Sequence, residues 1–380
     1  MRLLIVASNF PPVVGGIQTY AYEVARHLAP RCEDLLVVAP RSPGFREHDT
    51  HSPFTILRLP SAGDDLALSG IAPLARLLRG RRFDAAFATH WAPGFAVHTA
   101  SRLAARALPV FVAAHGKELL HRPLANVALA QTVYDHIRAR ALRTAAGFFP
   151  VSRRTAELLR ERGVTPERIT VAHNGVDPTR FAPRVTRRLR EQLGAEGPIV
   201  LSVARLVSRK GIDTVLRALP QVLASVPSVI YAVVGGGPDQ ARLQALCARL
   251  GLTNSVRFLP SVGNDLPDYY NGCDLFVLPT REEPGDIEGF GLVFLEAGAC
   301  EKPVIGARAG GVVDAISDGV TGLLVPPDDP SRLAEAMLEL LSNRARAEAM
   351  GHAARERVLR EGTWDHTAAK IADAIEHALR

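Results

Sequence analysis

The chain has 380 residues, of which 47% are hydrophobic and 22% are charged, and its 31 glycines and 27 prolines are spread along its length. This composition excludes disordered and fibrous proteins, and the length predicts two ordinary domains, each with its own hydrophobic core. The net charge of +6 is uneven, because residues 1–178 hold 22 Lys and Arg against 14 Asp and Glu, whereas residues 179–380 hold 23 against 25.

The basic N-terminal half suits an anionic partner, such as a lipid headgroup or a phosphorylated acceptor. Nearly all of the excess is arginine, so an ordinary solvated surface is an equal alternative. We do not expect nucleic acid as a partner, because no recognisable binding module accompanies the charge.

The four cysteines, Cys32, Cys247, Cys273 and Cys300, show neither metal-ligand nor redox spacing, and we expect buried thiols in a reducing compartment. The apolar start Met1–Ala7 is too short for a signal peptide, and no stretch reaches the ~18 uninterrupted apolar residues of a membrane span. We therefore expect a cytoplasmic protein, with peripheral contact at the inner face of the membrane as a further option.

Short, continuously apolar runs alternate with longer helical patterns along the whole chain. The strands expected in the first half are Leu3–Ala7, Leu35–Ala39, Phe54–Leu59, Ala85–Ala88, Val110–Ala114, Gly147–Val151 and Ile169–Ala172. Those expected in the second half are Ile199–Val203, Val229–Val234, Val256–Leu259, Leu275–Leu278, Val304–Gly306 and Leu323–Val325. The expected helices include Gln18–Leu28, Thr155–Glu161, Asp213–Leu223, Arg242–Leu250 and Thr367–Leu379. This alternation predicts an α/β fold with doubly wound parallel sheets.

The strand–helix pattern restarts near residue 198, shortly after the turn-rich segment Asn174–Pro178. We therefore expect an N-terminal domain over residues 1–178 and a C-terminal domain over residues 179–362. The last helix, within residues 363–380, either closes the C-terminal domain or crosses back to the first one. Two such domains facing each other would leave a cleft lined by the carboxyl ends of their strands.

The most informative segment runs from Glu288 to Glu296 and contains Gly289 and Gly291. The glycines let backbone amides approach a ligand closely, and Leu292–Ala299 predicts a helix that begins beside them. Such a helix N-terminus is a natural phosphate site. If the whole segment were helical, its two carboxylates would lie on the order of 12 Å apart. That is too far for the acid pair of a glycosidase and favours two separate hydroxyl-binding roles.

A second cluster carries cations, on a loop over Ser202–Gly211 between a buried strand and a helix. Arg205 and Lys210 would oppose the dipole of that helix, so their presence needs another reason. A diphosphate leaving group supplies one, because fixed positive charge stabilises the charge that develops on a departing phosphate. Arg209 is interpreted as a solvent-facing neighbour, and ordinary surface charge remains an alternative for the loop.

Three weaker motifs follow strands. Gly15-Gly16 opens a helix but lacks the spacing of a dinucleotide fingerprint, so it indicates at most a close backbone approach. His115 is either a capped structural residue or a substrate contact. Gly235-Gly236-Gly237 either admits a nucleotide or forms a tight turn.

The sequence has no D-x-D triplet, no H-E-x-x-H motif and no paired Cys/His spacing. We therefore expect neither a catalytic metal nor a cofactor.

Taken together, these motifs resemble the family 4 glycosyltransferases over essentially the whole chain. The likeness runs from Pro11-Pro12-x-x-Gly15-Gly16 through Asn174–Asp177 and Arg205-x4-Lys210-Gly211 to Glu288-x7-Glu296 and Gly310-Gly311…Gly322–Val325. It implies the GT-B fold of two facing Rossmann-like domains. It also implies transfer of a sugar from a nucleotide-diphosphate donor with retention of anomeric configuration.

The resemblance implies roles for individual residues. Arg205 and Lys210 should hold the donor diphosphate, Glu296 the ribose hydroxyls, and Glu288 the sugar hydroxyls. The amides of Phe290, Gly291 and Leu292 should lie close to the donor. His115 should contact the transferred sugar, with its backbone carbonyl near the anomeric carbon, and Gly16 should approach the phosphates.

Residues Arg281–Gly291 look most like the phosphatidylinositol mannosyltransferase branch, whose donor is GDP-mannose. The leading prediction is therefore a retaining hexosyltransferase that uses GDP-mannose and a lipid-linked, polysaccharide or small-molecule acceptor. UDP-glucose or UDP-GlcNAc is the alternative donor, because only a few base contacts, expected between Phe258 and Val262, separate GDP from UDP.

Two other classes of function stay open, namely a nucleotide-sugar 2-epimerase and a sugar-nucleotide-binding protein without catalysis. Residues 71–82 form either a short basic amphipathic element for a membrane or an ordinary surface helix. Neither the acceptor nor the oligomeric state has a signature in the sequence.

Overall fold

The computed structural model describes residues 1–60, 66–123 and 127–380. The chain divides into two compact units. The N-terminal unit comprises Met1–Asn174 together with Trp364–Arg380, and the C-terminal unit comprises Gly175–Thr363. The first crossing between the units falls in the turn-rich segment that contains the predicted boundary at residue 178.

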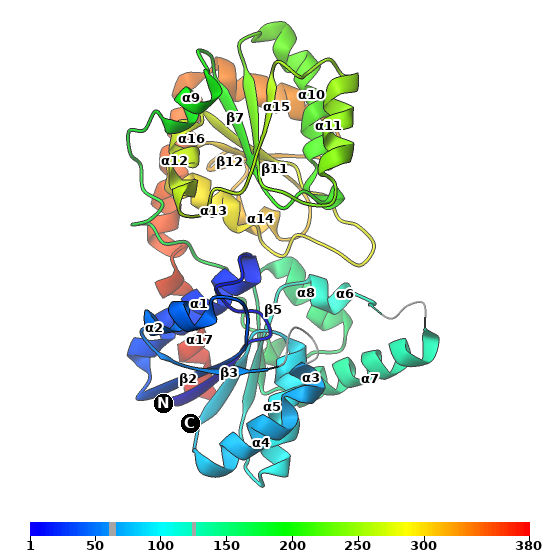
Figure 1. The fold of residues 1–380 in the computed structure, drawn as a ribbon, viewed down its shortest axis with the longest axis vertical. Coiled ribbons are helices and arrows are strands. Elements are labelled where there is room, and N and C mark those ends of the chain that lie inside the picture. Colours follow the sequence, from blue (N-terminus) through cyan, green and yellow to red (C-terminus); the bar gives the residue numbers. More distant parts are fainter. Residues whose placement is uncertain (61–65, 124–126) are drawn as a thin grey trace. The chain divides into compact units, whose positions relative to one another are not determined.

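The N-terminal unit contains a parallel six-stranded sheet in the order β3-β2-β1-β4-β5-β6 (Figure 1). Its strands are β1 Arg2–Val6, β2 Asp34–Pro40, β3 Thr55–Leu59, β4 Ala85–Ala88, β5 Val110–Ala114 and β6 Gly147–Pro150. The helices of this unit are α1 Gly16–Leu28, α2 Phe45–Thr50, α3 Leu66–Ser69, α4 Ile71–Gly80, α5 Trp91–Leu103, α6 Lys117–Leu120, α7 Ala128–Thr144, α8 Arg153–Glu161 and α17 Trp364–Ala378.

The C-terminal unit contains a second parallel six-stranded sheet, in the order β12-β11-β10-β7-β8-β9. Its strands are β7 Ile199–Val203, β8 Ile230–Val234, β9 Val256–Leu259, β10 Leu275–Leu278, β11 Val304–Ala307 and β12 Gly322–Val325. The helices are α9 Arg188–Leu193, α10 Ile212–Ser225, α11 Gln240–Arg249, α12 Leu266–Gly272, α13 Leu292–Ala299, α14 Val312–Ala315, α15 Pro330–Ser342 and α16 Arg344–Glu361.

The central strands are buried on both faces, as continuous apolar runs predict. In β1, residues Leu3 to Val6 are fully buried, and β4 and β10 are buried along their whole lengths. Helices then begin at side chains that satisfy their first amides. Ser152 accepts a hydrogen bond from the Thr155 N–H at the start of α8, and Asp329 accepts one from the Arg332 N–H before α15.

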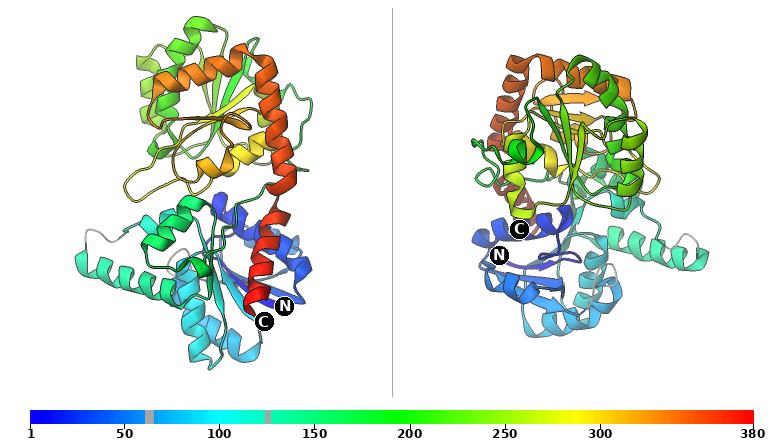
Figure 2. Two further views of the ribbon diagram at one scale, coloured as in Figure 1. Left: turned by 180° about the vertical axis from the view of Figure 1, so that it is seen from behind. Right: turned by 45° about the horizontal axis from the view of Figure 1, so that its top comes forward.

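The last helix, α17, packs against α1 inside the N-terminal unit (Figure 2). The ring of Trp364, at its first residue, meets the ring of Tyr20 of α1 edge-on, with centroids 6.1 Å apart. Ile371 and Ile375 of α17 are fully buried. The N-terminal unit is therefore built from both ends of the chain.

One predicted strand is wrong. Ile169–Ala172 runs beside β6, and the amides of Thr170 and Ala172 donate to the carbonyls of Phe148 and Pro150. Only one bridge, between Phe148 and Ile169, forms there. Pro150 has no N–H to continue the ladder, and this explains why no strand results.

Within the segment 71–82, residues Ile71–Gly80 form the surface helix α4. Its apolar residues Leu74 and Leu78 are buried, and the helix packs on α5. The buried apolar residues of α4 therefore face the N-terminal unit, as in an ordinary surface helix.

Candidate functional site

A cluster of charged residues joins two loops of the C-terminal unit. The Lys210 ammonium and the Arg209 guanidinium both donate to Oε2 of Glu288, with Arg209 Nη1 at 2.8 Å. Arg209 also pairs with Asp286, at 3.2 Å between Nε and Oδ2. The prediction for Arg209 is therefore wrong, because its side chain is 17% exposed and faces the carboxylates rather than solvent.

The two cations fix the charge state of Glu288. Burial alone would raise the pKa of this carboxyl group, but Lys210 and Arg209 outweigh burial and lower the pKa to about 2. Glu288 is therefore ionised at neutral pH. Its ion pairs hold the lysine and the arginine in one place before any ligand arrives.

Glycines allow a second loop to pack directly under this segment. The Gly311 N–H donates to the carbonyl of Glu288 at 2.8 Å, and a Cβ atom at Gly311 would lie 1.9 Å from the Gly289 carbonyl oxygen. Gly310 has a φ of 54° and approaches the Glu288 carbonyl similarly. The Gly310-Gly311 pair thus supports the backbone that carries Glu288.

The helix predicted over Leu292–Ala299 is present as α13. Gly291, with a φ of 96°, precedes it in the left-handed region, which favours glycine. Residues 288–291 are not helical, so the condition behind the 12 Å estimate for the two carboxylates is not met. The first residue of α13, Leu292, lies four residues after Glu288.

Glu296 lies on α13 and is held by a neighbouring helix. The Tyr270 hydroxyl of α12 donates to its Oε2 at 2.7 Å. Burial raises the pKa of Glu296, while the Tyr270 hydrogen bond and the nearby Arg180 lower it and only partly offset the effect of burial. Since Tyr270 occupies one carboxylate oxygen, Oε1 is the oxygen left for a further donor.

Arg205 is exposed on the loop after β7, and its guanidinium forms no hydrogen bond or ion pair with the residues that the structure describes. The glycines after β8 pack beside this loop. A Cβ atom at Gly235 would lie 2.0 Å from the Ala204 carbonyl oxygen, and one at Gly237 would lie 2.2 Å from that of Leu206. Close packing against the loop that carries Arg205 therefore explains why glycine stands at positions 235 and 237.

Phe258 and Val262 lie at and just after the carboxyl end of the edge strand β9, and both are half-buried. They belong to the C-terminal unit, as do all the predicted donor residues except Gly16.

In the N-terminal unit, His115 is buried directly after β5. Its Nε2 lies 2.9 Å from the Thr89 carbonyl, and its ring meets that of Tyr20 edge-on at 4.7 Å. Burial lowers the pKa of His115, with Glu118 and the Thr89 carbonyl opposing this in part. Since a carbonyl only accepts, the neutral ring carries its proton on Nε2, and its Nδ1 is an acceptor.

Two neighbours of His115 did not stand out in the sequence. Glu118 accepts a hydrogen bond from the His115 backbone N–H at 2.7 Å. His90, the N-cap of α5, is buried, and burial lowers its pKa to about 4. His90, like His115, lies just past the end of a buried strand, and this position was the available signal in the sequence.

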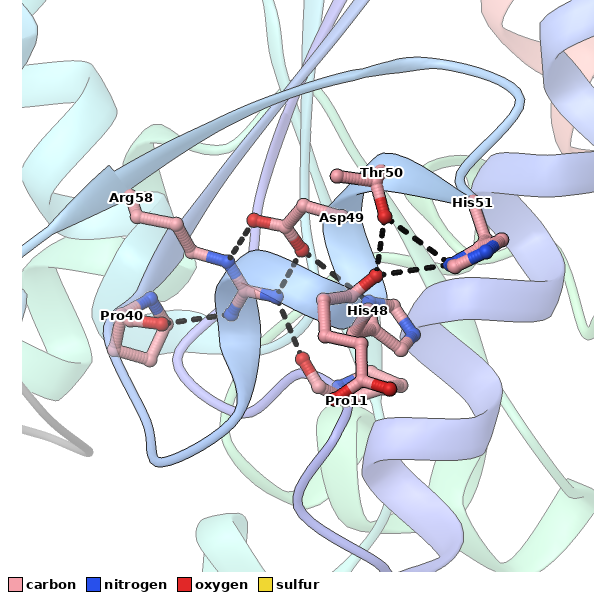
Figure 3. Close-up of polar contacts among 8 residues, drawn as sticks. Pro11, Pro40, His48, Asp49, Thr50, His51 and Arg58 are labelled. Carbon is pink, nitrogen blue, oxygen red and sulfur yellow. Dashed lines mark hydrogen bonds and ion pairs between the residues drawn. The ribbon is translucent and has the colours of Figure 1, made fainter.

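Arg58 anchors the loop that leads to Gly15 and Gly16 (Figure 3). The buried guanidinium donates to the carbonyls of Pro11 and Pro40, at 2.6 and 2.8 Å, and to both oxygens of Asp49. It thereby ties the loop after β1 to the ends of β2 and α2. Gly16 is exposed at the first position of α1.

Across residues 1–60, 66–123 and 127–380, no group of three or more acidic, His or Cys side chains is arranged to hold a metal ion. Among the helices described there, none combines the length and the apolar character needed to cross a membrane.

Two family models match the chain. Residues 14–180 match Glycosyltransferase Family 4, and residues 185–357 match Glycosyl transferases group 1. Together they cover most of both units.

Two relatives that match over nearly their full length carry the same description. The chain is 34% identical to a GDP-mannose-dependent alpha-(1-6)-phosphatidylinositol monomannoside mannosyltransferase of Mycobacterium tuberculosis (strain CDC 1551 / Oshkosh), over 98% of each chain. It is 32% identical to the protein of the same name from Mycolicibacterium smegmatis, again over 98% of each.

Among solved structures, Anabaena Alr3699/HepE in complex with UDP superposes with a TM-score of 0.83 at 22% identity, covering 99% of this chain and 100% of that one. At this identity the likeness shows the fold, which is GT-B.

Proposed function

The chain belongs to glycosyltransferase family 4, and we propose that this glycosyltransferase moves a mannosyl residue from GDP-mannose to a phosphatidylinositol mannoside. The observation that carries the proposal is full-length similarity to two relatives described with that donor and acceptor, combined with the Lys210–Glu288–Arg209 cluster. The basic N-terminal half suits an anionic, lipid-linked acceptor.

For the donor we assign the C-terminal unit. Lys210 and Arg205 would bind the diphosphate, since an ammonium has three N–H groups and only one is needed for Glu288. The amides of Phe290, Gly291 and Leu292 at the start of α13 would supply further donors. Glu296 would accept hydrogen bonds from the ribose hydroxyls at Oε1, because the Tyr270 hydroxyl contacts Oε2.

For the chemical step we propose transfer with retention. The bond between the anomeric carbon and the diphosphate breaks, the acceptor oxygen bonds to the same face of that carbon, and the acceptor proton passes to the departing phosphate. Positive charge at Lys210 and Arg205 stabilises the leaving diphosphate. We assign the His115 carbonyl to the anomeric carbon and Gly16 to the phosphates, as the family resemblance implies.

The donor is tested by thermal-shift titration with GDP-mannose, UDP-glucose and ADP-glucose. A ligand that binds only the folded protein raises its melting temperature, so GDP-mannose should give the largest increase. If UDP-glucose raised the melting temperature more than GDP-mannose does, UDP-glucose would be the donor and the proposal of GDP-mannose would be wrong.

Transfer is tested with radiolabelled GDP-mannose and vesicles that contain phosphatidylinositol monomannoside. Label should enter the lipid, and Lys210→Ala and Glu288→Gln should each lower the rate by roughly 10²–10³, the cost of losing one transition-state contact. Lys302→Ala, which changes a lysine of the same unit outside the cluster, should keep wild-type activity. An epimerised nucleotide sugar formed without acceptor would instead support an isomerase, and unaltered transfer by both cluster variants would refute the site.

A further inference from the structure

An arginine-lined hollow lies at the N-terminal end of β5 in the N-terminal sheet. It has a volume of about 500 Å³ and is formed by the end of α5, the loop that leads into β5, and the end of α7. The polar side chains that line it belong to His98, Ser101, Arg102, Arg106 and Thr144.

The hollow is separate from the residues assigned to catalysis in this unit. Val110, the first residue of β5, lines it, whereas His115 follows Ala114, the last residue of the same strand. Five residues of parallel strand span about 16 Å. The hollow and His115 therefore lie at opposite edges of one sheet.

Two arginines line this hollow, and no acidic side chain is among its described lining residues. The guanidinium groups of Arg102 and Arg106 are exposed, and neither forms a hydrogen bond or ion pair within the described part of the chain. Burial, together with Arg102 of α5 and Arg140 of α7, lowers the pKa of His98, so cations of two helices reach the same place.

Arginines often stabilise the carbonyl end of a helix, and this could account for the pair. At α5, however, a different side chain already fills that role, because Arg79 donates to the Leu103 carbonyl at 3.0 Å. Beyond it, Ala105 adopts a φ of 51°, which alanine disfavours, and this left-handed turn returns Arg106 to the hollow that Arg102 lines.

We propose that this hollow binds a phosphate-bearing anion at a site distinct from the donor site. Guanidinium groups match the oxygens of phosphate in geometry and charge, and the two here have no partner among the residues that the structure describes. A lipid headgroup and a soluble phosphate present the same chemistry to the hollow. The site accounts for part of the positive excess of the N-terminal half, which the donor site does not use.

The test uses the full chain and the double variant R102Q/R106Q, with GDP present to occupy the proposed donor site. The matched control is R160Q/R249Q, which removes two exposed arginines, in the last turns of α8 and α11, whose side chains have no partner among the described residues. Calorimetric titration with pyrophosphate measures the soluble anion. Co-sedimentation with phosphatidylcholine vesicles, with and without phosphatidylinositol, measures the headgroup.

We expect wild type and control to bind at least one probe equally, and R102Q/R106Q to bind it at least about tenfold more weakly. If R102Q/R106Q loses binding to pyrophosphate, the ligand is a soluble anion. If it loses binding only to vesicles that contain phosphatidylinositol, the ligand is a lipid headgroup. Equal weakening in the control, or no binding of either probe by wild type, would overturn the proposal. Melting temperature and stabilisation by GDP should be the same in all three proteins.

Discussion

At the residue scale, Glu288 makes the stability of the C-terminal unit depend on pH. Its pKa falls from an ordinary 4.5 to about 2 in the folded chain, so its ion pairs contribute stability above pH 4.5 that is lost as the pH falls to about 2. The shift corresponds to about 3 kcal/mol at neutral pH. Urea unfolding between pH 2 and 7 should show this loss in wild type and a flatter profile in Glu288→Gln. Glu356→Gln, at an exposed position, should follow wild type.

Arg58 gives a second prediction at this scale. Arg58→Ala leaves Asp49 and two carbonyls without their donor, and breaking such a buried pair should cost about 3 kcal/mol. Thermal unfolding measures the cost. Arg41→Ala removes an exposed, neighbouring arginine and should change the melting temperature little. A variant at position 58 as stable as that control would show that the anchor is unimportant.

Single residues were predictable where local chemistry marked them. Lys210 and Glu288 stood out because a cation loop and a glycine-flanked carboxylate are unusual in sequence. The roles of Arg209 and Tyr270 did not, since their partners Glu288 and Glu296 lie 79 and 26 residues away. No periodicity in the chain encodes such pairings.

At the element scale, the segment from Glu288 to α13 depends on a glycine beneath it. A Cβ at Gly311 would collide with the Gly289 carbonyl, and relieving the collision must move the backbone that carries Glu288. Gly311→Ala should therefore cost roughly 2 kcal/mol and weaken nucleotide binding. Gly80→Ala, where no atom lies within 4 Å of the added Cβ, should be harmless. Thermal shift with and without GDP-mannose checks both.

Strands could be predicted where the sequence pattern itself shows that a segment is buried. Central strands such as β4, β5 and β10 coincide with continuous apolar runs, because strands covered on both faces admit no polar alternation. The edge strands β3 and β9 contain Arg58 and Arg257 and are only partly buried. Ile169–Ala172 has the same apolar character, yet its neighbour β6 ends in a proline. A missing amide in the adjacent strand cannot be recognised before the pairing is known.

At the scale of the molecule, α17 should control the stability of the N-terminal unit. Ile371 is fully buried, and Ile371→Ala should cost about 3 kcal/mol. Both tryptophans, Trp91 and Trp364, belong to this unit, so their fluorescence reports its unfolding. Lys370→Ala, at the exposed residue before Ile371, should leave the stability of this unit unchanged. An unchanged fluorescence transition in Ile371→Ala would contradict the packing of α17.

The passage of the chain out of the N-terminal unit and back again has a consequence for biosynthesis. Residues 175–363 form one uninterrupted stretch, so the C-terminal unit has all its parts before α17 is synthesised. The N-terminal unit has its sheet first but lacks α17 until Trp364–Ala378 has been synthesised, and the surface of α1 around Tyr20 that α17 contacts stays uncovered until then. The unit whose sheet is synthesised first is therefore completed after the other unit, against the usual order in which domains fold as they emerge.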